Sequence, residues 1–164
     1  MTSESIAGGP RTAPEPRAHT LKAQGLVNSI TLTLLRTPLI SRAIGKRLLT
    51  LYVVGRKSGR RYTLPVAYTA HEGDLLIGTP FGWGRNLRTG EPVEIRLKGR
   101  KRLADVEVLA GEDGVTAAYD VMCRDNRNFA GFQHVGFDAD GNPDATDLSL
   151  AWAAGARAFR LTPR

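Results

Sequence analysis

The pattern of apolar positions along the chain changes its period twice. Between residues 21 and 36 apolar side chains recur at helical spacing, as at Ile30 and Leu34. From residue 48 to residue 109 the chain instead alternates apolar with polar positions, or forms short apolar runs bounded by turn residues, which is typical of β-strands. After Gly114 the helical spacing returns. The pattern therefore predicts helices at both ends of a β-rich centre.

Two N-terminal helices are expected between residues 21 and 47. Proline disfavours the α conformation of the residue before it, so Thr37-Pro38 should end the first helix, and the second should run to Lys46 with its basic side chains outward. Basic amphipathic helices either pack on a domain or lie on a membrane surface, and the sequence leaves both alternatives open. Residues 1–20 are polar and rich in proline and glycine, so we expect a flexible N-terminal arm.

Five consecutive strands with short connections are expected in the centre of the chain. They span residues 48–54, 62–69, 75–78, 93–97 and 103–109. Pro65 lies inside the second and favours an edge position there, because proline cannot donate to a sheet. Helices at about 115–123 and 147–156 and a final strand at 158–161 should follow, with an aromatic segment of undetermined structure between the helices. This order indicates an α+β fold with an antiparallel meander or barrel.

Charge is distributed unevenly along the chain. The formal net charge is +7, yet from Arg17 to His71 the sequence holds ten Lys or Arg residues and no Asp or Glu. From Glu72 onward twelve basic residues face fourteen acidic ones. A contiguous positive stretch suits a phosphate-bearing ligand, an anionic membrane surface or nucleic acid, or is simply a solvated face. The interleaving of aromatic and basic residues that nucleic-acid surfaces usually show is missing, so no nucleic-acid partner is expected.

The single cysteine, the three histidines and the first twenty residues limit which classes of protein fit the sequence. A single cysteine, Cys123, excludes an internal disulfide, and its apolar surroundings predict a buried, inert thiol. The three histidines are far apart, so we expect no metal site. The first twenty residues lack the apolar core of a signal peptide, and no run approaches the ~20 apolar residues of a spanning helix. We therefore expect a cytoplasmic protein, with peripheral membrane contact through the N-terminal helices left open.

The candidate chemistry is concentrated in the turn from Gly55 to Pro65, GRKSGRRYTLP. Two glycines bracket cationic side chains and a hydroxyl between two expected strands. Glycine lets the backbone turn sharply so that N–H groups can line an anion site, and arginine offers a planar fork to phosphate oxygens. The spacing is that of neither a Walker loop nor a dinucleotide-fold fingerprint. A second segment, Gly82 to Arg88, combines Trp83 with two glycines and an amide, although Trp83 is also an ordinary core residue type.

The order of these two segments along the chain resembles the order of motifs in a known protein family. GRKSGRRYTLPV at 55–66, HEGDLLIGTP at 71–80, WGRNLR at 83–88 and the strands from 93 to 109 are similar to the deazaflavin-dependent nitroreductases. These belong to the flavin and deazaflavin oxidoreductases of the FMN-binding split-barrel fold. The resemblance implies a split β-barrel of about six mainly antiparallel strands, with N-terminal and C-terminal helices packed on it, in a single domain over residues 21–164.

The resemblance also implies a cofactor site. Coenzyme F-420, a deazaflavin with a phosphate and an acidic tail, would be held at that tail by Arg56, Lys57, Ser58, Arg60 and Arg61. Its ring system would be flanked by Thr63, Pro65, Gly78, Thr79 and Pro80, and the pocket would be closed by Trp83, Asn86 and Leu87. The sequence departs from the family in the short segment 79–82, which lacks the lysine found there in well-characterised members.

The implied reaction is hydride transfer from reduced F-420 to an electron-poor small molecule such as a quinone, an enone or a nitro compound. The cofactor carries this chemistry, in agreement with the lack of a nucleophile, a Ser/His/Asp set or paired carboxylates. Tyr119 is the candidate proton donor. Two alternatives stay open: a non-catalytic carrier of coenzyme, lipid or fatty acid on the same barrel, and an FMN-dependent enzyme. A homodimer is expected from the fold alone.

Overall fold

The computed structural model describes residues 47–164. Its strands are β1 (Leu48–Val54), β2 (Arg61–Ala67), β3 (Thr69–His71), β4 (Asp74–Thr79), β5 (Val93–Leu97), β6 (Arg100–Leu109) and β7 (Arg157–Pro163). Its helices are the 3₁₀ helix η1 (Gly82–Asn86), α3 (Gly111–Asp125), α4 (Arg127–Phe132) and α5 (Ala145–Ala153). The predicted arm at 1–20 and the predicted N-terminal helices at 21–47 lie outside the described residues, apart from Arg47, which directly precedes β1.

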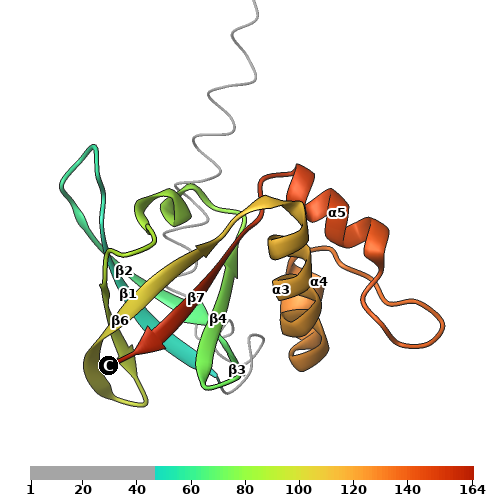
Figure 1. The fold of residues 1–164 in the computed structure, drawn as a ribbon, viewed down its shortest axis with the longest axis horizontal. Coiled ribbons are helices and arrows are strands. Elements are labelled where there is room, and N and C mark those ends of the chain that lie inside the picture. The colour runs from blue at the N-terminus through green and yellow to red at the C-terminus, as the bar shows by residue number, and fades with distance from the viewer. Residues whose placement is uncertain (1–46) are drawn as a thin grey trace, which may run out of the picture. The chain divides into compact units, whose positions relative to one another are not determined.

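The strands form one curled sheet in which every pair is antiparallel. Its order is β2-β1-β5-β6-β7-β4-β3. Three hairpins, β1–β2, β3–β4 and β5–β6, supply six of the seven strands, and the C-terminal β7 is inserted between β6 and β4 to join them. The sheet curls into a half-barrel whose edges are β2 and β3 (Figure 1). The α+β, antiparallel, barrel-like architecture is therefore as predicted.

The strand count and the connections differ from the prediction. The single strand predicted at 62–69 is divided into β2 and β3, which lie at opposite edges of the sheet. The division falls at Tyr68, whose N–H donates to the Arg47 carbonyl at 3.1 Å. The pairing of β2 with β1 ends at Ala67, and Thr69 pairs with Leu76 of β4 instead. The chain thus changes sheet edge at Tyr68, which makes seven strands rather than six.

Two apolar cores lie on the two faces of the curled sheet. The inner core is built from alternate residues of β1, β4, β5, β6 and β7, with Val66 of β2 and Leu87 after η1. The outer core lies between the β4–β7 part of the sheet and the helices, which gather on that side (Figure 1). The predicted aromatic segment forms α4, where Phe129 is buried. Cys123 is buried as predicted, and burial raises the pKa of its thiol to about 12.

The described part of the chain contains no helix long and apolar enough to cross a membrane. Its longest helix, α3, turns Val115, Tyr119 and Met122 toward the sheet, in the expected helical spacing. The helix begins at Gly111, four residues before the predicted start. A positive φ of +77° at this glycine allows the chain to leave β6 and turn directly into the helix.

Gly78 in β4 is a point of close approach between the sheet and the helices. A Cβ at this position would lie 2.9 Å from Phe129 Cζ, 2.9 Å from Tyr119 Cε2 and 3.0 Å from Met122 Cε. Only a residue without a side chain therefore lets α3 and α4 settle on β4. This packing places the segment that follows β4 directly beside α4.

Gly78→Ala should destabilise the protein by about 1–3 kcal/mol, because the added methyl group overpacks a core of large rings. Gly114→Ala is the matched control, since a Cβ there would meet only Leu109, at 3.8 Å and 3.9 Å. In the helix this control should gain about 0.5–1 kcal/mol. Urea unfolding measures both. Equal effects of the two substitutions would contradict the close packing at Gly78.

Candidate functional site

The topology brings the basic turn and η1 to the same end of the half-barrel. The turn follows Val54, and the start of β5 lies at that end because Glu94 pairs with Tyr52 whereas Leu97 pairs with Leu49. Since η1 lies between β4 and β5 in the chain, it crosses this end of the sheet, beside the projecting β1–β2 turn (Figure 1). Two segments about 30 residues apart in the sequence are thereby neighbours.

The turn has a defined internal geometry. Gly55 N–H donates to the Arg60 carbonyl at 2.8 Å, and Gly59 N–H donates back to the Gly55 carbonyl at 2.7 Å. Ser58 Oγ accepts the Arg60 N–H at 3.3 Å. A Cβ on Gly55 would lie 2.6 Å from Ser58 Oγ, and Gly59 has a φ of +64°, so both glycines are needed. The turn is therefore a fixed loop rather than a random basic connection.

Asn86 ties this turn to η1. Its Oδ1 accepts the Arg56 N–H at 3.2 Å, while its Nδ2 donates to the Trp83 carbonyl at 3.0 Å. Trp83 packs partly buried against the inner core, and Leu87 lies within it. Trp83 and Leu87 thus anchor η1 to the barrel. Asn86 then connects η1 to the basic turn through its hydrogen bond with the Arg56 N–H.

The cationic side chains of the turn divide into paired and unpaired groups. Arg56 forms an ion pair with Glu91 at 2.8 Å, and Arg61 forms one with Glu94 at 3.3 Å. Lys57 and Arg60 are exposed and make no ion pair with any residue from 47 to 164. The same is true of Arg85 and Arg88, which flank Asn86 in the chain. The two segments that the Arg56–Asn86 hydrogen bond joins therefore carry four cations that could meet an anionic ligand.

Backbone donors of the turn point to the same chemistry. In the described part of the chain the N–H groups of Lys57 and Ser58 have no protein acceptor. Successive unpaired N–H groups in a glycine-bounded turn form an anion-binding concavity, and lysine and arginine add charge to it. Ser58 adds a hydroxyl, which lies 3.4 Å from the Tyr62 hydroxyl. The turn can accordingly grip a phosphate or carboxylate group.

The residues predicted to flank a cofactor ring are not gathered in one place. Arg61, Thr63 and Pro65 share the face of β2 opposite the inner core, where Arg61 lies over the Tyr52 ring at 5.8 Å. Gly78 is covered by helices, as described above. Thr79 is buried, and its Oγ1 accepts the Phe81 N–H at 3.0 Å. Pro80 is exposed between Thr79 and Phe81.

Tyr119 lies inside the outer core. Its side chain is 1% exposed and its hydroxyl donates to the Arg157 carbonyl at 3.3 Å. Burial holds the pKa of this phenol well above its usual range. A group so enclosed does not reach a ligand at the surface, so the prediction of Tyr119 as proton donor is corrected here, and we assign it a role in packing.

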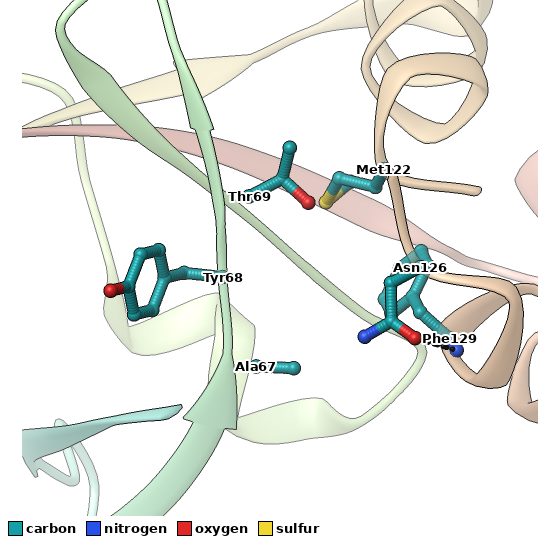
Figure 2. A pocket seen from close by; sticks show the side chains of 6 residues that line it. All are labelled: Ala67, Tyr68, Thr69, Met122, Asn126 and Phe129. Atoms are coloured by element: carbon teal, nitrogen blue, oxygen red, sulfur yellow. Dashed lines mark hydrogen bonds between the residues drawn. The ribbon is translucent and has the colours of Figure 1, made fainter. Parts of the chain in front are cut away.

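A shallow pocket lies at the opposite end of the β1–β2 hairpin. It is lined by Ala67, Tyr68 and Thr69 on one side and by Met122, Asn126 and Phe129 of the helical side on the other (Figure 2). The Thr69 hydroxyl donates to Asp125 at 3.0 Å, and Arg47 binds the same carboxylate at 2.8 Å. These polar groups hold the sheet to α3, so the pocket is a packing junction. Within residues 47–164 no cluster of three or more His, Cys, Asp or Glu side chains could hold a metal ion.

Sequence reasoning missed the acidic partners of the site. Glu91 lies 35 residues from Arg56 and Glu94 lies 33 residues from Arg61, so no local pattern could have paired them. Arg85 directly precedes Asn86 in the chain, and the sequence gives no sign that its segment contacts the basic turn. The one usable signal was Asn86, an amide at a fixed distance after a tryptophan.

Asn86→Ala should release the turn from η1. Loss of the side-chain acceptor should speed hydrogen exchange of the Arg56 amide by about fivefold, because a neutral hydrogen bond contributes about 1 kcal/mol. The Gly59 amide, bonded within the turn, should exchange at an unchanged rate. Asn128→Ala on α4 is the control, and exchange is read by NMR. An unchanged Arg56 rate in Asn86→Ala would contradict the tether.

Comparison with known proteins adds little to this geometry. No family model and no curated protein matches the sequence. Among solved structures, the chain is similar to a conserved hypothetical protein from Mycobacterium tuberculosis, with 13% identity and a TM-score of 0.47 over 78% of this chain and 81% of that one. At this level the likeness carries no functional argument, and the function is inferred from the site itself.

Proposed function

We propose that the chain is an oxidoreductase that binds a phosphate-bearing deazaflavin coenzyme at the basic turn. In this proposal it transfers a hydride from reduced coenzyme F-420 to an electron-poor small molecule. The observation that carries it is the hydrogen bond from Arg56 N–H to Asn86 Oδ1. That bond unites the two segments on which the resemblance to deazaflavin-dependent enzymes rests, and it fixes the turn in one conformation.

The charge arrangement supports a phosphate rather than a general solvated face. On a surface whose cations serve only for solvation, we expect no regular arrangement of ion-paired and unpaired side chains. Here Arg56 is held by Glu91, while Lys57 and Arg60 have no ion-pair partner among residues 47–164. A loop that is already ordered loses little conformational entropy when its N–H groups bind an anion, which strengthens binding. The site therefore suits a compact, multiply charged group such as a phosphate with an acidic tail.

The protein residues hold and orient the coenzyme, and the coenzyme supplies the hydride chemistry when bound. Lys57, Ser58 and Arg60 would meet its phosphate, with Arg85 and Arg88 nearby for a further acidic group. Arg56 would position the loop through Glu91. Hydride acceptors such as quinones can take their proton from water, so the proposal assigns no protein residue as proton donor.

Two other functions would use the same phosphate grip. A non-catalytic coenzyme carrier would bind F-420 without turnover, and an FMN enzyme would prefer the flavin. The segment from Thr79 to Gly82 contributes no lysine, which leaves the turn as the main source of phosphate contacts. The choice of coenzyme is thus the most direct discriminator between these functions.

The purified full chain should bind coenzyme F-420 more tightly than FMN in a fluorescence titration. Lys57→Ala/Arg60→Ala should weaken F-420 binding by roughly 10- to 100-fold, since two exposed cations that contact a phosphate together contribute about 1.4–2.7 kcal/mol, less than two well-formed buried charge-assisted hydrogen bonds would. The matched control is Lys98→Ala/Arg100→Ala, which removes the same charge from the β5–β6 turn at the other end of the sheet.

The coenzyme affinities of the two double variants and of the parent distinguish the possible functions. Equal weakening by both would indicate a long-range charge effect rather than a site. No binding of either coenzyme at micromolar concentration would overturn the oxidoreductase proposal. Binding of F-420 without reduction of any quinone, enone or nitro compound would favour the carrier, and tighter binding of FMN would favour a flavin enzyme.

A further inference from the structure

Ser58 lies in the middle of the basic turn, which projects away from the sheet (Figure 1). Residues 56–60 are all exposed. Arg56 and Lys57 precede the serine, Arg60 follows it after one glycine, and the turn itself contains no Asp or Glu. Ser58 is therefore an accessible residue in a segment of uniformly positive charge.

The fold makes little use of the Ser58 hydroxyl. Its Oγ accepts the Arg60 N–H at 3.3 Å, which is long for a bond of this type, commonest near about 2.9 Å. By comparison, the Thr89 hydroxyl accepts the Val108 N–H at 2.9 Å. The backbone bonds at Gly55 and Gly59 close the turn without this hydroxyl. Rotation about the Cα–Cβ bond of Ser58 can thus turn Oγ outward and leave the turn closed.

The groups around Ser58 would attract a phosphoryl group attached to it. Lys57 and Arg60 have no ion-pair partner among residues 47–164. In the same part of the chain the N–H groups of Lys57 and Ser58 have no protein acceptor. Phosphorylation adds about 1.5 to 2 negative charges and three strong acceptor oxygens, which pair with arginine, lysine and backbone N–H groups. A phosphoserine here would be held by its own turn.

We propose that Ser58 is a phosphorylation site, and that its phosphoryl group occupies the basic turn and closes it to other anions. This inference rests on the proposed function, because it names a regulation of the same anion grip. A phosphoryl group bonded to Oγ stays beside the donors at an effective concentration in the millimolar range or above. It would therefore compete with the phosphate of a free coenzyme for the same N–H groups and cations.

The modification is a phosphoryl transfer from a nucleoside triphosphate. A bond forms between Ser58 Oγ and the γ-phosphorus, and the bond from that phosphorus to the β,γ-bridging oxygen breaks. The nucleoside diphosphate leaves, and the hydroxyl proton passes to the general base of the kinase. The partner is a serine kinase with an acidic substrate groove, since complementary charge favours association with a turn that carries cations on both sides of the serine.

The test uses the full chain with phosphoserine incorporated at position 58. Binding of pyrophosphate and, separately, of coenzyme F-420 should weaken about tenfold or more, because the tethered anion competes for the site. Phosphothreonine at Thr146 is the matched control. Thr146 is exposed on α5, on the opposite side of the described structure from the turn, and its modification should leave both affinities within about twofold (Figure 1).

NMR and stability show whether the phosphoryl group occupies the turn or disrupts it. The Lys57 amide proton should move downfield on phosphorylation, as a new bond to phosphate requires. The Tm should equal or exceed that of the parent, since the phosphoryl group gains partners. A lower Tm, or an unmoved Lys57 resonance with weakened binding, would overturn the inference by showing that the turn is disrupted rather than occupied.

A basophilic serine kinase with ATP provides the second arm. Mass spectrometry should find phosphate on Ser58 of the folded chain, at a rate that bound pyrophosphate lowers, and none at this position in Ser58→Ala. An unmodified Ser58, or pyrophosphate affinity unchanged by phosphoserine, would overturn the inference. Failure of F-420 to bind the unmodified chain, with pyrophosphate behaving as expected, would overturn the proposed coenzyme and keep the phosphorylation site. Tight F-420 binding that phosphoserine leaves unchanged would do the reverse.

Discussion

The hydrogen bond between Arg56 N–H and Asn86 Oδ1 is the contact on which the rest of the site depends. On one side it holds a loop whose shape is set by Gly55 and Gly59. On the other it reaches η1, which Trp83 and Leu87 anchor to the inner core. The basic turn is closed by its own hydrogen bonds but projects from the sheet, so without this tether it would not be held against η1. With it, the cations and backbone donors that have no partner within residues 47–164 stay beside η1 at one end of the half-barrel.

Local patterns were sufficient to predict most of the elements of the fold. Alternation located β1 and β5 at the predicted bounds, and helical spacing identified the buried face of α3. The division of the strand at Tyr68 could not be predicted, because it depends on Thr69 pairing with Leu76 of β4 instead of continuing along β1, and no local pattern shows that change of partner. The place of β7 between β6 and β4 is equally non-local, since no residue within β7 specifies its two neighbours.

The candidate site was predictable to a similar extent. Cations between two glycines indicated an anion grip, and the order of the two motifs indicated that they act together. What the sequence could not show is which residues face the ligand. Gly78 and Thr79 occupy the expected strand end, yet close packing against α4 and a bond to Phe81 commit them to the fold.

The central claim is that the turn recognises a phosphate group through a loop fixed by Asn86. The most direct measurement is an NMR titration of the backbone amides with coenzyme F-420 and, separately, with its deazaflavin ring system lacking the phosphate arm. The account predicts that F-420 shifts the Lys57 and Ser58 amide resonances strongly and that the ring system alone does not. Equal shifts with both compounds, or shifts confined to residues outside the turn, would contradict it.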